Sequence, residues 1–348
     1  MTAIPRAERK LPMTTRRPLI ARGERAPDFA LPRGDSEETT RFYGLVGGRP
    51  TILVLAGGDV GAVVADLAAK LASAPHSDLD IHVVTRTPTD AVEGAFHDPE
   101  GRVHDAYGAP GDEPVAVVLD LNVRVVASAA IHDADTTLAA IADAVPTPPA
   151  DDGIPAPRLA PVLFVPDTLD ETLRDELVER WETEGSVETG VETVVEGERA
   201  EATDVRRKRR RDHTVTDPQL LRRLTQHIGA RVFPELQKAF AFQAGAFEGF
   251  KIGCYTAENR GHFEAHRDNL SAGTAHRRFG LTLNLNEDYD GGELRFPEYG
   301  PTRYRPAAGE ALLFSGSHLH EVLPVERGRR FVLLSFVLAR GGHVTRGH

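Results

Sequence analysis

The amino-acid sequence predicts two domains: a layered α/β domain, followed by a strand-rich domain built as a sandwich or barrel. The chain has 348 residues, whereas single hydrophobic cores seldom grow beyond roughly 250 residues. Short β-branched runs alternate with helical patterns over residues 24–145, and short strands separated by turns dominate residues 250–338. Between them, residues 146–161 (PTPPADDGIPAPRLAP) contain prolines that exclude a helix or a central strand. The domain boundary is therefore expected in this segment.

The first domain is expected to alternate strands with helices. β-Branched runs predict buried strands, and Ala/Leu-rich segments predict helices. The expected strands are residues 50–58, 79–87 and 115–129, the last divided into two strands at residues 120–122, and the expected helices are residues 60–74 and 133–145. This alternation is typical of α/β layers.

The second domain is expected to begin with a strand and an amphipathic helix within residues 162–185. Four apolar residues recur there at every fourth position, which places them on one face of a helix that Asp or Thr would cap. They are Leu169, Leu173, Leu177 and Trp181. A second helix is expected at residues 217–228. Strands are then expected at residues 250–257, 278–286, 292–297, 309–316 and 330–339, a density that predicts a sandwich or barrel.

Charge, hydropathy and cysteine content narrow the class of protein. The net charge of −11 at pH 7 argues against general nucleic-acid binding, which needs a basic surface. No apolar run approaches the roughly 18 residues of a membrane helix. The first residues carry positive charge without the apolar core of a secretory signal, and Met13 is a second candidate start. With Cys254 as the single cysteine, the sequence predicts a cytoplasmic protein.

A basic run, RRKRRR at residues 206–211, follows the acidic residues 183–204. One interpretation is a nucleic-acid-binding or targeting patch. The other, which is favoured, is a solvated loop and strand edge whose charges offset those of the acidic segment.

The segment GHFEAHRDN, residues 261–269, contains a pair of candidate metal ligands. In an extended strand, residues two apart point to the same face, so His266 and Asp268 would present an imidazole and a carboxylate to one point. His320, at the edge of a later strand, is the candidate third ligand. Two histidines and one carboxylate on one face leave open positions around a metal, which suits non-haem Fe(II). Taken alone, each residue also fits a structural role.

Arg330 lies within the last expected strand, where strand alternation turns its neighbour Arg329 the other way. A buried guanidinium needs an anionic partner. The distal carboxylate of 2-oxoglutarate, which would bind the iron through its keto acid end, would supply that partner. Arg330 is therefore the expected anchor for this co-substrate.

These residues belong to an ordered set of motifs. The set is Tyr255, His266, Asp268, LNLN (283–286), GGELRFP (291–297), Gly309, Phe314, His320, Pro324, Val325, Gly328 and Arg330. In this order it resembles the 2-oxoglutarate- and Fe(II)-dependent dioxygenases, specifically the prolyl 4-hydroxylase-like branch, over about residues 160–340. The resemblance implies an α+β domain built on a double-stranded β-helix, or jelly roll.

The resemblance also implies roles for particular residues. His266, Asp268 and His320 would bind Fe(2+). Arg330 and Tyr255 would hold the 2-oxoglutarate carboxylate, with Asn284 and Thr282 on the strand that lines the same pocket. In halogenating relatives a small residue replaces the carboxylate ligand, so the presence of Asp268 favours hydroxylation. The implied reaction uses O₂, hydroxylates a C–H bond and releases succinate and CO₂, with ascorbate as a candidate reductant.

The substrate stays open at this stage. A peptidyl residue, a free amino acid and a small metabolite all fit, and Asn269, His276 and His318 are candidate substrate-binding residues that also fit solvated surface positions. Two alternative functions are a nucleic-acid demethylase of the same superfamily and a non-catalytic binding or scaffold protein.

The first domain carries a second resemblance. RGERAPDFALPRGD (22–35), followed by GRPTILVLAGGD (48–59) and later by Pro114, resembles the peroxiredoxin or thioredoxin-like fold over about residues 20–145. Those families place a cysteine after the strand, and none is present here. Because a thiolate is the nucleophile in that chemistry, thiol redox activity is excluded, and the domain is expected to serve stability, homodimerisation or substrate docking.

The expected division of the chain follows from both resemblances. It comprises an N-terminal extension (1–21), a thioredoxin-like domain (22–146), a linker (147–161) and a dioxygenase domain (162–340).

Overall fold

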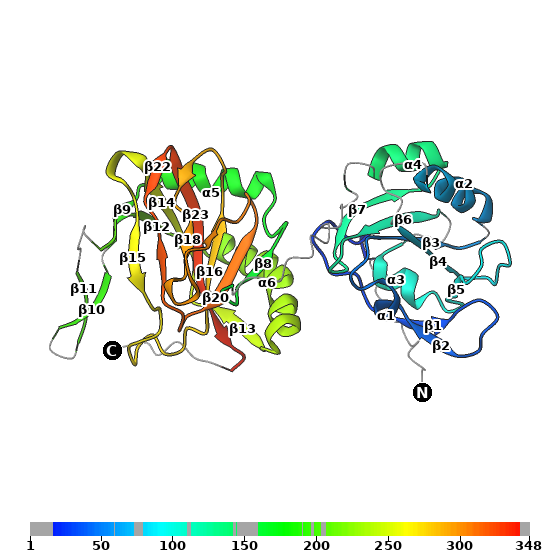
Figure 1. The fold of residues 1–348 in the computed structure, drawn as a ribbon, viewed down its shortest axis with the longest axis horizontal. Helices are drawn as coiled ribbons and strands as arrows, with labels where there is room; N and C mark the ends of the chain where they lie inside the picture. Colours follow the sequence, from blue (N-terminus) through cyan, green and yellow to red (C-terminus); the bar gives the residue numbers. More distant parts are fainter. Residues whose placement is uncertain are drawn as a thin grey trace, which may run out of the picture. The chain divides into compact units, whose positions relative to one another are not determined.

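The computed structural model describes residues 17–58, 60–72, 79–109, 113–141, 144, 159–189, 191–195, 198–202 and 207–341. The chain divides into two compact units, Met1–Asp151 and Asp152–His348, which Figure 1 draws in sequence colours. Most of the predicted extension and most of the predicted linker lie outside the described residues. Among the helices of the described part, none has the length and apolar character needed to cross a bilayer.

The first unit is built around a mixed five-stranded sheet in the order β5-β4-β3-β6-β7. Its strands are β3 (Thr51–Ala56), β4 (Asp80–Thr85), β5 (Phe96–His97), β6 (Val115–Leu119) and β7 (Val125–Ala130). β3, β4 and β5 are parallel, whereas β6 and β7 run antiparallel to their neighbours. Every residue of β3 is buried, as expected for a central strand covered on both faces.

Helices cover both faces of this sheet. α2 (Gly61–Ala72) and α4 (Ala134–Ile141) pack against one face of β3. α1 (Phe42–Val46) and α3 (Arg102–Tyr107) pack against the other face, next to the hairpin of β1 (Ala30–Pro32) and β2 (Thr39–Arg41). The predicted α/β layering is confirmed. The sequence analysis missed α1, α3 and β5, because such short elements show too little periodicity.

The second unit contains a large and a small antiparallel sheet. The large sheet has the order β8-β20-β16-β23-β14-β12-β9, with β13 also paired to β23. Its strands are β8 (Leu163–Val165), β9 (Val187–Glu188), β12 (Arg211–Thr214), β13 (Ala244–Phe247), β14 (Lys251–Thr256), β16 (Phe279–Asn284), β20 (Ala311–Ser315) and β23 (Arg329–Ala339). The small sheet has the order β15-β21-β18-β19. Its strands are β15 (Phe263–His266), β18 (Leu294–Arg295), β19 (Arg303–Tyr304) and β21 (His320–Val322).

Two further strand pairs belong to this unit. They are β17 (Asp290–Gly291) with β22 (Val325–Arg327), and the hairpin of β10 (Val191–Val195) and β11 (Glu198–Ala202).

The two sheets face one another across a shared core. Tyr255 and Phe314 from the large sheet cluster with Leu294 and Val322 from the small sheet. The chain passes repeatedly from one sheet to the other, as from β14 to β15 and on to β16. Successive strands that alternate between two packed antiparallel sheets form a jelly roll, so the predicted fold of this unit is confirmed.

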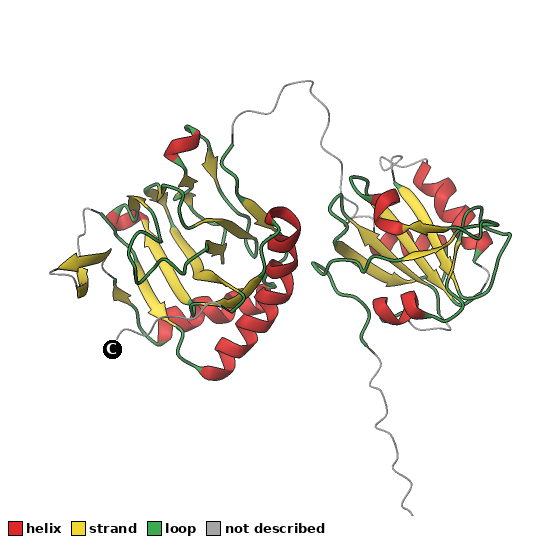
Figure 2. Cartoon of the chain, turned by 90° about the horizontal axis from the view of Figure 1, so that it is seen from below, coloured by secondary structure: helices red, strands yellow, loops and turns green. Residues whose placement is uncertain are grey.

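Helices α5 (Glu171–Thr183) and α6 (Pro218–Phe240) lie along the outer face of the large sheet, as Figure 2 shows. Asp170 caps α5 by accepting a hydrogen bond from the backbone N–H of Leu173. The predicted end of the second helix at residue 228 was wrong. The buried apolar stripe of α6 continues to Leu236, and its packing outweighs the cost of Pro234 inside the helix.

Candidate metal centre

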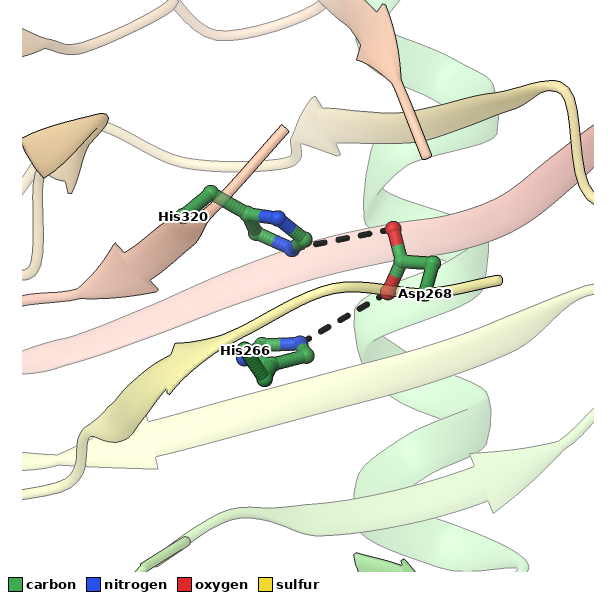
Figure 3. A group of neighbouring side chains, drawn as sticks. All are labelled: His266, Asp268 and His320. Atoms are coloured by element: carbon green, nitrogen blue, oxygen red, sulfur yellow. Dashed lines mark ion pairs between the residues drawn. The ribbon is translucent and has the colours of Figure 1, made fainter. Parts of the chain in front are cut away.

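His266, Asp268 and His320 point toward one another in Figure 3. His266 ends β15, His320 begins β21, and the two residues are paired directly across the strands. Asp268 lies beyond the end of β15 in a bend, so the prediction that an extended strand carries both His266 and Asp268 was wrong. The backbone N–H of Asp268 donates to Gly316 O at 2.9 Å, and this long-range bond brings the carboxylate to the same side as the two rings.

The three side chains have the geometry of a metal site. Each offers one ligand atom, and these atoms lie within 4.8 Å of one another. Nε2 of His266 is 3.6 Å from Oδ1 of Asp268, and Nε2 of His320 is 3.6 Å from Oδ2. Oδ2 is buried and has no hydrogen-bond partner in the described part of the chain, whereas buried carboxylate oxygens normally have one. A cation held between the three groups would satisfy this oxygen.

The backbone fixes the second nitrogen of each imidazole. Nδ1 of His266 lies 2.8 Å from Glu264 O, and Nδ1 of His320 lies 3.0 Å from His318 O. A carbonyl only accepts, so each Nδ1 carries the proton and leaves Nε2 a lone pair for a metal. Burial, together with the neighbouring His320, lowers the pKa of His266 to about 3. His266 is therefore neutral at neutral pH and can bind a cation without losing a proton.

Aromatic rings and one glycine hold the ligands in place. The Phe263 ring stacks on the His266 ring at a centroid distance of 3.7 Å, and the Phe314 ring lies 4.4 Å from that of His320. A Cβ added to Gly280 would lie 2.7 Å from the Phe314 ring and 3.1 Å from Oδ2 of Asp268. Any side chain at position 280 would therefore displace both the aromatic wall and the carboxylate.

Arg330 is 1% exposed, whereas its neighbour Arg329 points to the surface. The Arg330 guanidinium donates to Asn284 Oδ1 at 3.0 Å and to Thr282 Oγ1 at 3.5 Å. It also lies 5.6 Å from the centroid of the Tyr255 ring. Among the residues that the structure describes, no carboxylate pairs with it. Because a buried charge without a counter-charge is costly, this position fits an anionic ligand from outside the chain.

A single cavity of about 1000 Å³ is lined by the three candidate ligands and by Arg330. Tyr255 and Thr282 also line it. Asn284 is absent from the described lining: its amide holds the guanidinium of Arg330 and donates to Tyr289 Oη and to Pro306 O. The structure thus brings the predicted co-substrate residues together but places Asn284 outside the cavity wall.

Most of the residues around this cavity lie in one stretch of the chain. Residues 250–338 match the 2OG-Fe(II) oxygenase superfamily. The match includes all three candidate ligands and Arg330. The second unit of the chain therefore contains a 2OG-Fe(II) oxygenase domain.

The oxygenase domain is similar to proteins named PKHD-type hydroxylases. One from Pseudomonas fluorescens is 37% identical over 121 residues, which are 31% of this chain and 53% of the relative. One from Pseudomonas putida is 37% identical over 102 residues, which are 29% of this chain and 41% of the relative. The chain thus spans about half the length of the curated relatives it matches.

Solved structures similar to this chain include two prolyl hydroxylases. A prolyl-4-hydroxylase of Pseudomonas putida is 20% identical with a TM-score of 0.37, covering 52% of this chain and 94% of that one. The second is a Trichoplax adhaerens prolyl hydroxylase, solved in complex with a hypoxia inducible factor oxygen degradation domain peptide fragment. It is 15% identical with a TM-score of 0.40, and the match covers 52% of this chain and 84% of that one. Both TM-scores are low, so the jelly roll of the oxygenase domain is assigned from its own strand order.

The sequence analysis missed that the basic run contributes to the wall of the oxygenase cavity. Arg207, Lys208 and Arg210 line it; the side chains of Lys208 and Arg210 are 6% and 10% exposed, whereas Arg207 is more exposed and Arg211 lies outside the lining. The described part of the basic run, residues 207–211, is thus divided between buried and exposed positions and does not form one continuous surface patch. In an extended segment alternate side chains face opposite sides, and this alternation could have indicated that Lys208 and Arg210 share one side.

The three candidate substrate-binding residues lie outside the described lining of the oxygenase cavity. Each is engaged in a polar contact with a neighbouring side chain. Asn269, His276 and His318 contact Ser317, Glu248 and Tyr299, at 2.8, 2.8 and 3.3 Å respectively.

The buried carboxylate of Asp212 is expected to make the stability of the oxygenase unit sensitive to acid. Arg210 donates to its two carboxylate oxygens at 2.5 and 2.8 Å, and Nζ of Lys208 lies 3.5 Å away. Burial alone would raise the pKa of Asp212, but attraction to Arg210 and Lys208 outweighs burial and lowers it to about 2. A lowered folded-state pKa adds stability above the unfolded value, about pH 4, which is lost as the pH falls toward about 2.

We therefore expect Asp212 to contribute about 2 kcal/mol of acid-sensitive stability. Trp181, the single tryptophan, lies in α5, so its fluorescence reports unfolding of this unit. Asp212→Asn should unfold at a lower temperature than the wild type at pH 6, and the difference should narrow as the pH falls below about 4. A difference that stays constant down to about pH 2 would contradict the lowered pKa.

Proposed function

We propose that this chain is an Fe(II)- and 2-oxoglutarate-dependent dioxygenase that hydroxylates a C–H bond and releases succinate and CO₂. One observation carries the proposal: a single cavity is shared by the cluster of two histidines and one carboxylate and by a buried Arg330 that lacks a carboxylate partner in the described residues. The cluster fits non-haem Fe(II), and Arg330 fits a dicarboxylate. The superfamily match and the PKHD-type relatives support the same reaction.

In this proposal His266, Asp268 and His320 hold the iron through two Nε2 atoms and a carboxylate. The bound iron supplies the chemistry that activates O₂, with 2-oxoglutarate as the electron donor. The two Nδ1–H groups, bonded to Glu264 O and His318 O, keep the imidazoles oriented. The rings packed against the two histidines help exclude water from the reacting atoms. Because Asp268 occupies the carboxylate position, hydroxylation is favoured over halogenation.

The co-substrate site is proposed to form around Arg330. Arg330 binds the distal carboxylate of 2-oxoglutarate, and Tyr255 and Thr282 donate hydrogen bonds from the same wall. Asn284 acts by fixing the guanidinium, since its Oδ1 accepts from both Nε and Nη2 of Arg330. Ascorbate is proposed as the reductant that restores Fe(II).

The prime substrate is proposed to be a peptidyl residue, an amino acid or a small metabolite. A volume of about 1000 Å³ is at the upper end for a small-molecule pocket, so the cavity has room for the co-substrate and part of a larger molecule. Asn269, His276 and His318 are retained as candidates for contacts outside the cavity wall. Nucleic acid is the less favoured substrate, because the basic run that would favour it is partly buried. The complete ligand set argues against a non-catalytic scaffold.

We also propose that the first unit is a thioredoxin-like module without redox activity, within residues 22–146. Its mixed sheet with helices on both faces supports this proposal, and residues 22–146 contain no cysteine. The proposal also places a linker at residues 147–161 and the oxygenase domain at residues 162–340, and it includes a cytoplasmic location. In it the first unit serves stability, homodimerisation or substrate docking.

The test is turnover of 2-oxoglutarate by the purified full-length chain. We expect succinate formation that requires Fe(II) and O₂, proceeds faster with ascorbate and rises with the correct substrate. Peptides, free amino acids, small metabolites and methylated oligonucleotides form separate arms, so that stimulation by the last arm alone would identify a demethylase instead. A protein that binds Fe(II) but forms no succinate in any arm would refute the proposed activity.

A further inference from the structure

Two guanidinium groups lie close to the Tyr255 ring. The Tyr255 side chain is buried and lines the cavity. The Arg330 guanidinium lies 5.6 Å from the ring centroid, and the Arg210 guanidinium lies 5.5 Å from it. Nη1 of Arg210 also donates a hydrogen bond to the Tyr255 hydroxyl oxygen at 3.1 Å. The phenol therefore contacts the arginine assigned to the co-substrate and a second arginine that has no assigned role.

The orientation of Arg210 is rigidly determined. Its Nε and Nη2 are both bonded to the two oxygens of Asp212, at 2.5 and 2.8 Å, and the Asp212 side chain is fully buried. This fork uses one edge of the planar guanidinium and leaves Nη1 for Tyr255. The register of β12 with β14 pairs Arg211 with Cys254, which places residue 210 beside residue 255.

The direction of the hydrogen bond follows from chemistry. A guanidinium has no acceptor, so the Tyr255 oxygen must accept from Arg210. The hydroxyl oxygen that accepts from Arg210 keeps its own proton, so Tyr255 is also an O–H donor. The described residues provide no acceptor for this proton within hydrogen-bond distance. A buried donor in a cavity wall without a protein acceptor fits an acceptor on a ligand.

We infer that Arg210 is a positioning residue of the co-substrate site: by donating to the Tyr255 hydroxyl, it directs the Tyr255 proton to the carboxylate of 2-oxoglutarate. This inference rests on the proposed function. Arg210 acts through Tyr255 and does not contact the co-substrate itself. Arg330 supplies the charge at this carboxylate, and Tyr255 supplies a directed hydrogen bond.

The test is binding of 2-oxoglutarate to the Mn(II)-loaded full-length chain, measured by calorimetry. A hydrogen bond to a charged group typically contributes enough for about a tenfold change in affinity. We therefore expect Arg210→Gln to weaken 2-oxoglutarate binding about tenfold, and Tyr255→Phe to weaken it at least as much. Mn(II) affinity should stay within about twofold of the wild type. The double variant should bind no more weakly than Tyr255→Phe alone, because both changes remove one interaction.

A second variant, Arg210→Lys, distinguishes loss of the hydrogen bond to Tyr255 from unfolding of the protein. It keeps a positive charge opposite Asp212, but one ammonium group cannot replace both the fork and the bond to Tyr255, so 2-oxoglutarate affinity should fall while the unfolding temperature holds. Arg211→Gln is the matched control: it removes the same charge from the next residue, whose exposed side chain bonds to Ser186.

The outcomes separate the two levels of inference. Additive losses in the double variant would mean that Arg210 contacts the co-substrate directly, which overturns the positioning role. Unchanged affinity in both Arg210 variants would overturn it as well. A wild-type protein that binds Mn(II) but not 2-oxoglutarate would instead refute the proposed function.

Discussion

His266→Ala is expected to lose Fe(II) binding and all succinate formation. Nε2 of His266 is one of three ligand atoms within 4.8 Å of one another, and two ligands alone hold a divalent metal weakly. Loss of a residue that merely supports a ligand lowers metal affinity about 10- to 100-fold, so loss of a ligand should exceed about 100-fold. Metal content after dialysis and succinate formation measure the two effects.

His262→Ala is the matched control, because it removes an imidazole from the same chain segment but outside the ligand cluster. It should retain metal binding and turnover. If His266→Ala still formed succinate in an iron-dependent reaction, the proposed function would be contradicted. Equal losses in both variants would point to a folding defect, which Trp181 fluorescence would detect.

The sequence predicted that His266, Asp268 and His320 would lie together, and the structure brings them together, but the sequence did not predict how Asp268 reaches the cluster. The alternation rule for a strand placed Asp268 beside His266, yet β15 ends at His266. The carboxylate reaches the cluster because the Asp268 backbone donates to Gly316 O, a contact between residues far apart in the chain. Local sequence patterns do not contain such contacts, so the strand rule gave the wrong reason for the position of Asp268, and its role as a metal ligand stays a prediction.

The role of Arg210 was hidden for a similar reason. Within RRKRRR every residue is basic, so composition does not distinguish buried positions from exposed ones. The distinction arises when β12 pairs with β14 and places Arg210 against Tyr255. The length of α6, in contrast, could have been predicted from the sequence. Its apolar stripe continues in the sequence to Leu236, and Pro234 does not end the helix because the helix is well packed.

Arg330→Gln is expected to weaken 2-oxoglutarate binding about 100-fold while leaving the metal site intact. Arg330 is 1% exposed, and its guanidinium has no carboxylate partner in the described residues, so the co-substrate would be its counter-charge. Removing one member of a buried charge pair costs about 3 kcal/mol or more, which is a loss of affinity of about 100-fold. The KM for 2-oxoglutarate should rise accordingly, while Mn(II) affinity should stay within about twofold of the wild type.

Arg330→Gln should weaken co-substrate binding, but it should not lower the stability of the protein without co-substrate. Without co-substrate, Arg330→Gln removes an uncompensated buried charge, so its unfolding temperature should equal or exceed that of the wild type. Added 2-oxoglutarate should raise the unfolding temperature of the wild type, because the ligand binds only the folded state. It should not raise the unfolding temperature of the variant.

Arg329→Gln provides the matched control. It removes the same charge from an exposed ion pair with Glu182, and such pairs contribute less than about 1 kcal/mol to stability. If Arg329→Gln weakened 2-oxoglutarate binding as much as Arg330→Gln, overall charge rather than a specific anchor would explain co-substrate binding.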